Sequence, residues 1–212
     1  MTLAAACVAA ISCALAIPIG LICVFSPALL DLWLGESFVR LSPLLILMLI
    51  HLIVNVGVYP LFSAQVAVNR VKWPGLAAVF MGLVNLVLAI LLVRRFNYGI
   101  YGVAIAAAIT ITLRDGLFTA IYGAHILRQP WYTFLKCYLP GLILLGTILL
   151  LGFGIGLYVN AASWWRLLLI CLAIGLVGLI VMRIILPRQD RRIVAELLPS
   201  RIRGLGRVLV SS

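Results

Sequence analysis

The chain has 212 residues, of which 66% are hydrophobic and 10% charged, and its mean hydropathy is +1.27. A soluble domain of this length carries far more surface charge, so the composition excludes a water-soluble globular protein and predicts an integral membrane protein. The net charge of +11 points to anionic lipid head groups rather than nucleic acid as the partner, because the basic residues lie mostly at the ends of apolar runs and in the tail.

Six apolar stretches are long enough to cross a bilayer, which takes roughly 20 helical residues because lipid offers the backbone no hydrogen-bond partner. They cover approximately residues 3–30, 41–62, 74–93, 100–127, 138–158 and 164–186. The first stretch holds Pro18 in its middle, which predicts a kink or a strong tilt. We therefore expect an all-α fold, a polytopic membrane bundle of six transmembrane helices, over residues 1–186.

Aromatic and basic residues mark the ends of these spans. All five tryptophans lie at the borders of the apolar runs, which is typical of the aromatic belt between lipid tails and head groups. Eleven of the sixteen Lys and Arg residues fall on one side of the predicted topology and four on the other, with Arg114 inside the membrane. The richer side should be cytoplasmic, so both termini are predicted to lie in the cytoplasm.

Residues 187–212 form a separate basic segment with six arginines and two acidic residues. Its apolar residues fall near helical spacing, which predicts an amphipathic helix lying on anionic lipids at the membrane surface. These residues are Ile193, Val194, Leu197, Leu198 and Ile202. The alternative is a disordered basic tail that only fixes the topology of the spans.

The sequence holds none of the residue patterns that are typical of an enzyme or a metal site. The five cysteines lie in apolar runs without metal-ligand spacing, and there is no paired carboxylate site, no HExxH, no GxSxG and no P-loop. We therefore expect no catalysis and no cofactor.

Arg114 and Asp115 are adjacent near the middle of the fourth span. An ionised side chain at this depth costs about 2.5–3.5 kcal/mol on insertion scales, so such residues usually face a bundle interior or a wet cavity. Adjacent helical positions point about 100° apart, so the two side chains need not pair. We expect Arg114 to bind an anionic substrate group, with Asp115 as counter-ion or proton carrier. The alternative is structural: the two residues hold helices together, or Arg114 extends toward the interface.

Other polar residues inside the spans are weaker candidates for substrate contact. His51 and Asn55 are four residues apart on one face of the second span, and Asn85 lies in the third. Hydrogen bonds between helices explain such residues equally well. Gly102 and Ala106, near the start of the fourth span, form a small-xxx-small pair and predict close packing against another helix.

Four short motifs follow one another between about Ile17 and His125. They are Leu32-Trp33-Leu34-Gly35-Glu36-Ser37-Phe38 at the end of the first span, Ala67-Val68-Asn69-Arg70-Val71-Lys72 before the third, Asn85-Leu86 within the third, and Tyr98-Gly99-Ile100-Tyr101-Gly102-Val103-Ala104-Ile105-Ala106 at the start of the fourth. Their order and spacing resemble the polysaccharide flippases. These are the O-antigen and teichoic-acid exporters of the superfamily that includes the multidrug and toxic compound extrusion transporters.

The resemblance implies a role in moving undecaprenyl-pyrophosphate-linked oligosaccharides across a bacterial cytoplasmic membrane by alternating access of two lobes. Members have about twice as many spans, so the chain is similar to the C-terminal six-helix lobe. It is then a fragment, or it needs a second six-helix lobe as a partner. Arg114 would attract the pyrophosphate or an acidic sugar, and Arg70 and Lys72 would assist at the cytoplasmic mouth.

Two other functions stay open at this level. One is a cation-coupled exporter of drugs or metabolites on the same fold, with Asp115 as the coupling carboxylate. The other is a membrane subunit that transports nothing and anchors a glycan-assembly complex through its basic tail.

Overall fold

The computed structural model describes residues 3–156 and 163–185, and within these ranges the chain is helical and has no strand. Six helical segments in this part are long and apolar enough to cross a membrane. They are Leu3–Val24, Glu36–Ala67, Lys72–Arg94, Gly99–Ile126, Thr133–Gly154 and Trp164–Ile185. The prediction of an all-α polytopic membrane protein is confirmed. The helix or disordered tail predicted at 187–212 lies outside the described residues.

The first span consists of α1, Leu3–Val24, followed by the shorter α2, Ser26–Leu34. α1 continues through Pro18, and the helix is interrupted at Phe25 instead. A proline in the first turn of α2 fits this place, because the backbone N–H groups of a first turn have no partner within the helix. Gly35 ends α2 at a φ of +94°, and the short 3₁₀ helix η1, Glu36–Leu41, leads into the second span.

Three short helices make up the rest of the second span: α3, Ser42–Ile50; α4, Leu52–Gly57; and α5, Tyr59–Ala67. In the structure this span continues beyond its predicted end at about residue 62. The polar Gln65, which was expected in a loop, is buried in the bundle. The break between α4 and α5 comes just before Pro60, whose ring interferes with a continuous helix.

The third and sixth spans are single helices, and the fourth and fifth are assembled from shorter pieces. The elements are α6, Lys72–Arg94; α7, Gly99–Ile111; the π-helix η2, Thr112–Thr119; α8, Ala120–Ile126; α9, Thr133–Cys137; α10, Leu139–Gly156; and α11, Trp164–Ile185.

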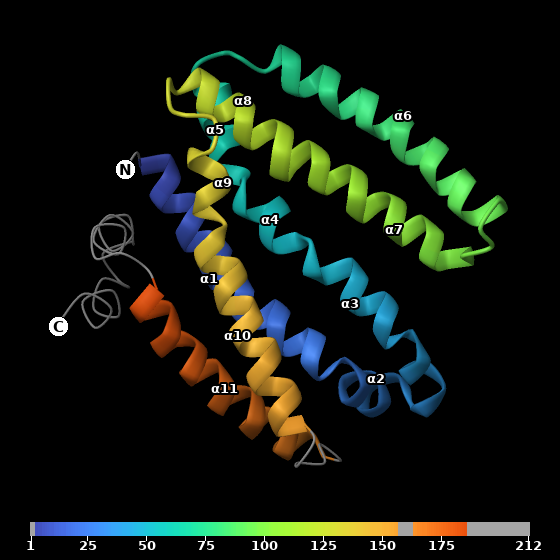
Figure 1. Cartoon of the computed structure of the whole chain (residues 1–212). Helices are drawn as coiled ribbons and strands as arrows, with labels where there is room; N and C mark the ends of the chain where they lie inside the picture. Colours follow the sequence, from blue (N-terminus) through green and yellow to red (C-terminus); the bar gives the residue numbers. More distant parts are fainter. Residues whose placement is uncertain (1–2, 157–162, 186–212) are drawn as a thin grey trace.

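The spans lie side by side in an order that differs from their order in the chain (Figure 1). The α6–α7 hairpin forms one edge, α3 to α5 follow, then α1 with α10, and α11 forms the other edge. The α5–α6 turn and the α8–α9 connection meet at the same end of the bundle. We call this the basic end, defined by Arg70, Lys72 and Arg128.

The best-packed part of the bundle is the contact between α1 and α10. Small buried side chains such as Ala9, Ser12 and Ala16 line α1 and let the neighbouring backbones come close. A Cβ added at Gly141 of α10 would lie 2.8 Å from the Cβ of Ser12, so only glycine fits there. The predicted close packing at Gly102 is also present: both Gly102 and Ala106 are buried, and Gly102 faces Leu92 of α6.

Candidate functional site

The candidate site lies in the π-helical segment η2, in the middle of the fourth span. In a π-helix the backbone bonds join residues five apart, and such segments occur frequently at functional sites. The hydroxyl of Thr119 donates a hydrogen bond to the carbonyl oxygen of Arg114, five residues earlier, at 3.0 Å. Arg114 and Thr119 therefore both belong to the π-helical turn, and this side-chain bond has the same five-residue spacing as its backbone bonds.

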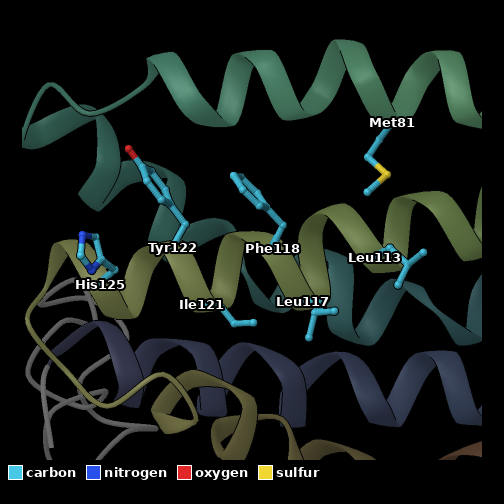
Figure 2. A pocket seen from close by; sticks show the side chains of 7 residues that line it. All are labelled: Met81, Leu113, Leu117, Phe118, Ile121, Tyr122 and His125. Carbon is cyan, nitrogen blue, oxygen red and sulfur yellow. The ribbon is translucent and has the colours of Figure 1, made fainter.

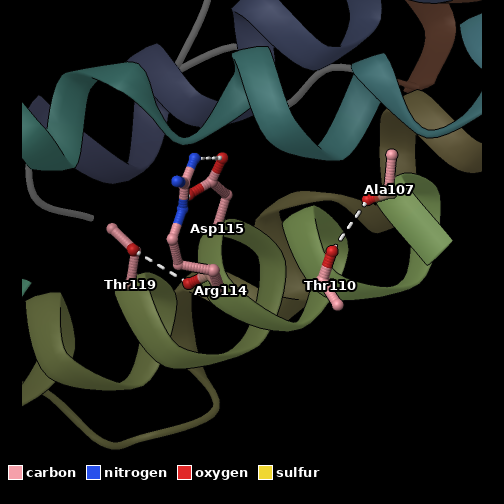
Figure 3. Close-up of polar contacts among 5 residues, drawn as sticks. All are labelled: Ala107, Thr110, Arg114, Asp115 and Thr119. Atoms are coloured by element: carbon pink, nitrogen blue, oxygen red, sulfur yellow. Dashed lines mark hydrogen bonds and ion pairs between the residues drawn. The ribbon is translucent and has the colours of Figure 1, made fainter. Parts of the chain in front are cut away.

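Arg114 and Asp115 form a two-pronged ion pair with each other (Figure 3). Nε of Arg114 lies 2.7 Å from Oδ1 of Asp115, and Nη2 lies 2.9 Å from Oδ2. Two parallel N–H···O bonds are the strongest arrangement open to a guanidinium and a carboxylate. The sequence left the pairing open because the two Cβ atoms point about 100° apart. The long arginine side chain bridges that angle.

The two partners differ in exposure. The side chain of Asp115 is 5% exposed, whereas that of Arg114 is 34% exposed. Asp115 lies on the face of η2 that packs against α4, where a Cβ added at Gly116 would lie 2.6 Å from Val54. The acid is thus held inside the bundle, and the arginine at the surface of the site is the partner that a ligand could reach.

Buried polar atoms without a protein partner also occur on the helices around η2, in the described part of the chain. Asn55 of α4 is 4% exposed, and neither its amide nitrogen nor its amide oxygen has a hydrogen-bond partner in the described part of the chain. The same holds for the hydroxyls of Ser12 and Tyr138, which flank Gly57. A buried polar group left unpaired costs about 1–3 kcal/mol, so these groups have bonding capacity for a ligand or for Asp115 itself.

The other predicted site residues are distributed over the bundle. His51 lies at the break between α3 and α4, half-buried, with Nδ1 3.1 Å from the carbonyl oxygen of Leu47. Asn55 follows one turn later on α4, the helix whose Val54 faces Gly116 of η2. The side-chain oxygen of Asn85 on α6 is buried and unpaired within the described ranges.

Arg70 and Lys72 lie at the basic end rather than beside the ion pair. The hydroxyl of Tyr122 donates to the carbonyl oxygen of Arg70 at 3.4 Å. Tyr122 follows Arg114 by eight residues, which corresponds to roughly 12 Å along a helix. The structure therefore pairs Arg114 with Asp115 on η2, which contacts the helix α4 that carries Asn55, and it leaves Arg70 and Lys72 at the end of the bundle.

Sequence analysis did not identify Ser12, Thr119 or Tyr138. Gly116 was the available signal for the special backbone, since a glycine directly after two charged residues is unusual inside a span. Ser12 and Tyr138 are inconspicuous in the sequence, because a serine among alanines and a tyrosine at a span border are both ordinary in membrane helices.

Comparison with known proteins shows a partial similarity to a longer membrane protein. A stretch of 122 residues, 58% of this chain, is 35% identical to the "uncharacterized membrane protein EpsK" of Bacillus subtilis (strain 168). The match covers 24% of EpsK, so the chain spans about a quarter of the relative it matches. No protein family described by a sequence model matches the chain. No solved structure matches it either. The chain is thus a polytopic membrane protein that is similar, over more than half of its length, to a longer membrane protein.

Proposed function

We propose that the chain is one lobe of a flippase that moves lipid-linked oligosaccharides across a bacterial cytoplasmic membrane, with both termini in the cytoplasm. The six-span bundle, the motifs that resemble polysaccharide flippases and the similarity to a membrane protein support this proposal. One observation carries it: a partly exposed guanidinium stands in the middle of a span, paired to a carboxylate that is almost completely buried.

An anionic head group can enter a low-dielectric layer only where fixed positive or polar groups replace its water. A phosphate group binds arginine in the same two-pronged geometry as the carboxylate of Asp115. A pyrophosphate that reaches Arg114 would therefore compete directly with Asp115. The unpaired amide nitrogen of Asn55 and the hydroxyl of Tyr138 would then be available as donors to the displaced carboxylate.

The remaining predicted residues have subordinate roles in this scheme. Arg70 and Lys72 would attract the head group to the basic end before it reaches Arg114, and His51 and Asn85 would contact its sugars. A second six-helix lobe would complete the cavity, and alternating access of the two lobes would carry the head group across.

Binding of a prenyl-pyrophosphate-linked sugar to the purified, detergent-solubilised chain tests the role of Arg114. We expect Arg114→Gln to weaken binding about tenfold or more, because a charge-assisted two-pronged contact is lost. Arg114→Lys should give an intermediate loss, since an ammonium keeps the charge without the planar fork. Arg166→Gln, which removes an exposed charge at the start of α11, is the matched control. Equal affinity of Arg114→Gln and the wild type refutes the assigned site.

The burial of Asp115 favours one competing function, a cation-coupled exporter in which this carboxylate carries the coupling ion. Proteoliposomes distinguish the two functions. Proton- or sodium-driven efflux of a small substrate that disappears in Asp115→Asn, together with no binding of the sugar lipid, would establish the exporter instead of the flippase.

A further inference from the structure

The segment η2–α8 has two faces of different character. One face is buried against α4, α5 and α9 and is built from small or polar residues: Asp115, Gly116, Thr119, Ala120, Gly123 and Ala124. The opposite face is apolar and exposed at Leu113, Leu117 and Ile121, and it ends in the exposed His125. The ion pair uses the first face, so the second face has no part in the proposed binding of the sugar head group.

This face, together with Phe118 and Tyr122, lines a groove that runs along η2–α8 (Figure 2). Its volume is about 540 Å³. The rings of Phe118 and Tyr122 stack at 5.7 Å and point toward α6, from which Met81 closes the groove. From Leu113 to His125 the lining extends over twelve residues, or roughly 18 Å. Half of a bilayer's hydrocarbon core is about 15 Å thick, so the groove has the length of one leaflet.

The groove ends at the basic end of the bundle. Tyr122 of the groove donates to the backbone of Arg70, which fixes the α5–α6 turn beside it. Asn69 and Arg128 both have φ values of +52°, and in each turn the next N–H bonds back to a carbonyl five residues earlier. These turns hold Arg70 and Arg128 beyond the ends of α5 and α8, both exposed.

Positive charge at this end is not balanced by acidic residues in the described ranges. Asp31 and Glu36 lie in α2 and η1 at the opposite end of the bundle, and Asp115 faces the other side of η2, paired with Arg114. Arg70, Lys72 and Arg128 are all exposed, and His125 lines the groove three residues before Arg128. An apolar groove of one leaflet's length therefore leads to a cluster of three unopposed positive charges.

We propose that this groove is a binding site for an anionic phospholipid of the surrounding bilayer. One acyl chain lies along Leu113, Leu117 and Phe118, and the phosphate is bound by Arg70, Lys72 and Arg128. A basic pocket between membrane helices is a recognised way to bind an anionic head group. The length of the groove favours a phospholipid chain over a polyprenyl chain, which would extend far beyond it. The site shares Arg70 and Lys72 with the proposed path of the sugar head group, whereas its apolar groove is separate from the Arg114–Asp115 pair.

Native mass spectrometry of the intact chain, titrated with phosphatidylglycerol or phosphatidylcholine of identical acyl chains, tests the charge requirement. The wild type should bind phosphatidylglycerol at least tenfold more tightly. Each basic residue near the surface contributes a factor of about five, so the combined variant R70Q/K72Q/R128Q should lose this preference at the site. R94Q/R95Q, which removes exposed charges at the other end of the bundle, should keep it. The arginine-rich tail is present in every variant, so its contribution to lipid binding is the same in all of them.

A second variant tests the groove itself. Leu117→Trp fills the groove and should weaken binding of phosphatidylglycerol at least fivefold, whereas Leu86→Trp on the exposed surface of α6 should leave it unchanged. Equal affinities for the two phospholipids, or unchanged binding in both R70Q/K72Q/R128Q and Leu117→Trp, overturn the proposal. Displacement of phosphatidylglycerol by an equimolar polyprenyl phosphate would also overturn it, because the ligand would then be the carrier lipid.

Discussion

α1 and α6 are spans of nearly equal length and similar apolar composition, yet they have opposite environments. About half of α1 is buried, and no residue of α6 is buried. α1 is lined with alanine, serine and cysteine where α10 crosses it, whereas α6 presents leucine, valine and phenylalanine to its surroundings. Lipid tails are as apolar as leucine, so hydropathy decides that a helix enters the membrane, and small residues decide where it packs.

The fourth span combines both situations in one helix. Its inner face packs through Gly116 and Gly123 against Val54 and Leu61, and its outer face is exposed. The ion pair lies at the border between the two faces. The free energy of unfolding should therefore be sensitive to loss of charge in the fourth span and to loss of close backbone packing between α1 and α10. It should be insensitive to substitutions on α6.

The largest effect is expected for breaking the ion pair from one side. Arg114→Ala leaves the buried carboxylate of Asp115 without its partner and should lower the free energy of unfolding by about 3 kcal/mol. Asp115→Ala should cost less, about 2 kcal/mol, because the one-third exposed arginine is screened and can extend toward the interface. Titration with SDS in mixed micelles measures both values.

The double variant R114A/D115A provides the control for this prediction. It removes both charges together, so it should be more stable than Arg114→Ala alone. A double variant whose loss equals the sum of the two single losses would show that the two side chains do not act as a pair.

The packing side of the comparison is tested by adding one methyl group to a glycine. Gly141→Ala places a Cβ 2.8 Å from the Cβ of Ser12 and 2.9 Å from its backbone carbon, and should destabilise the fold by about 2 kcal/mol. Gly82→Ala adds the same group to α6, where nothing lies within 4 Å, and should cost nothing. Equal losses in SDS titration would contradict the distinction between α1 and α6.

The sequence was sufficient to predict the number, order and approximate limits of the spans. Each follows from the need of a helix to satisfy its backbone bonds in lipid, which depends on local composition alone. The breaks at Phe25, His51 and Val58 were not predicted. Pro27 and Pro60 follow the breaks at Phe25 and Val58, so these two breaks have a local cause in the sequence, whereas no proline follows the break at His51 closely.

The candidate site, too, was predictable only in part from the sequence. Two charged residues in mid-span identify Arg114 and Asp115, because their insertion cost is a local property. Their pairing and the burial of only the acid depend on how η2 crosses α4, and the sequence pattern of a single span carries no information about that crossing.

A smaller effect is expected where η2 packs on α4. Gly116→Ala places a Cβ 2.6 Å from a methyl carbon of Val54, and should cost about 1.5 kcal/mol because that methyl can move only partly. Gly123→Ala meets Leu61 at 3.2 Å or more and should cost less. Thermal unfolding in detergent, followed by circular dichroism, ranks the two. The reverse order would show that the crossing is closest at α5 rather than at α4.

The smallest effect concerns the hydroxyl that bonds five residues back. Thr119→Val keeps the shape of the side chain and removes the bond to the carbonyl of Arg114, so it should cost about 1 kcal/mol. Thr147→Val removes an otherwise similar bond to Ile143, four residues back in the regular helix α10, at a more exposed position. That variant should be nearly neutral in SDS titration. The difference between the two threonines measures what the π-helical turn contributes, and a zero difference would mean that Arg114 holds its position through Asp115 alone.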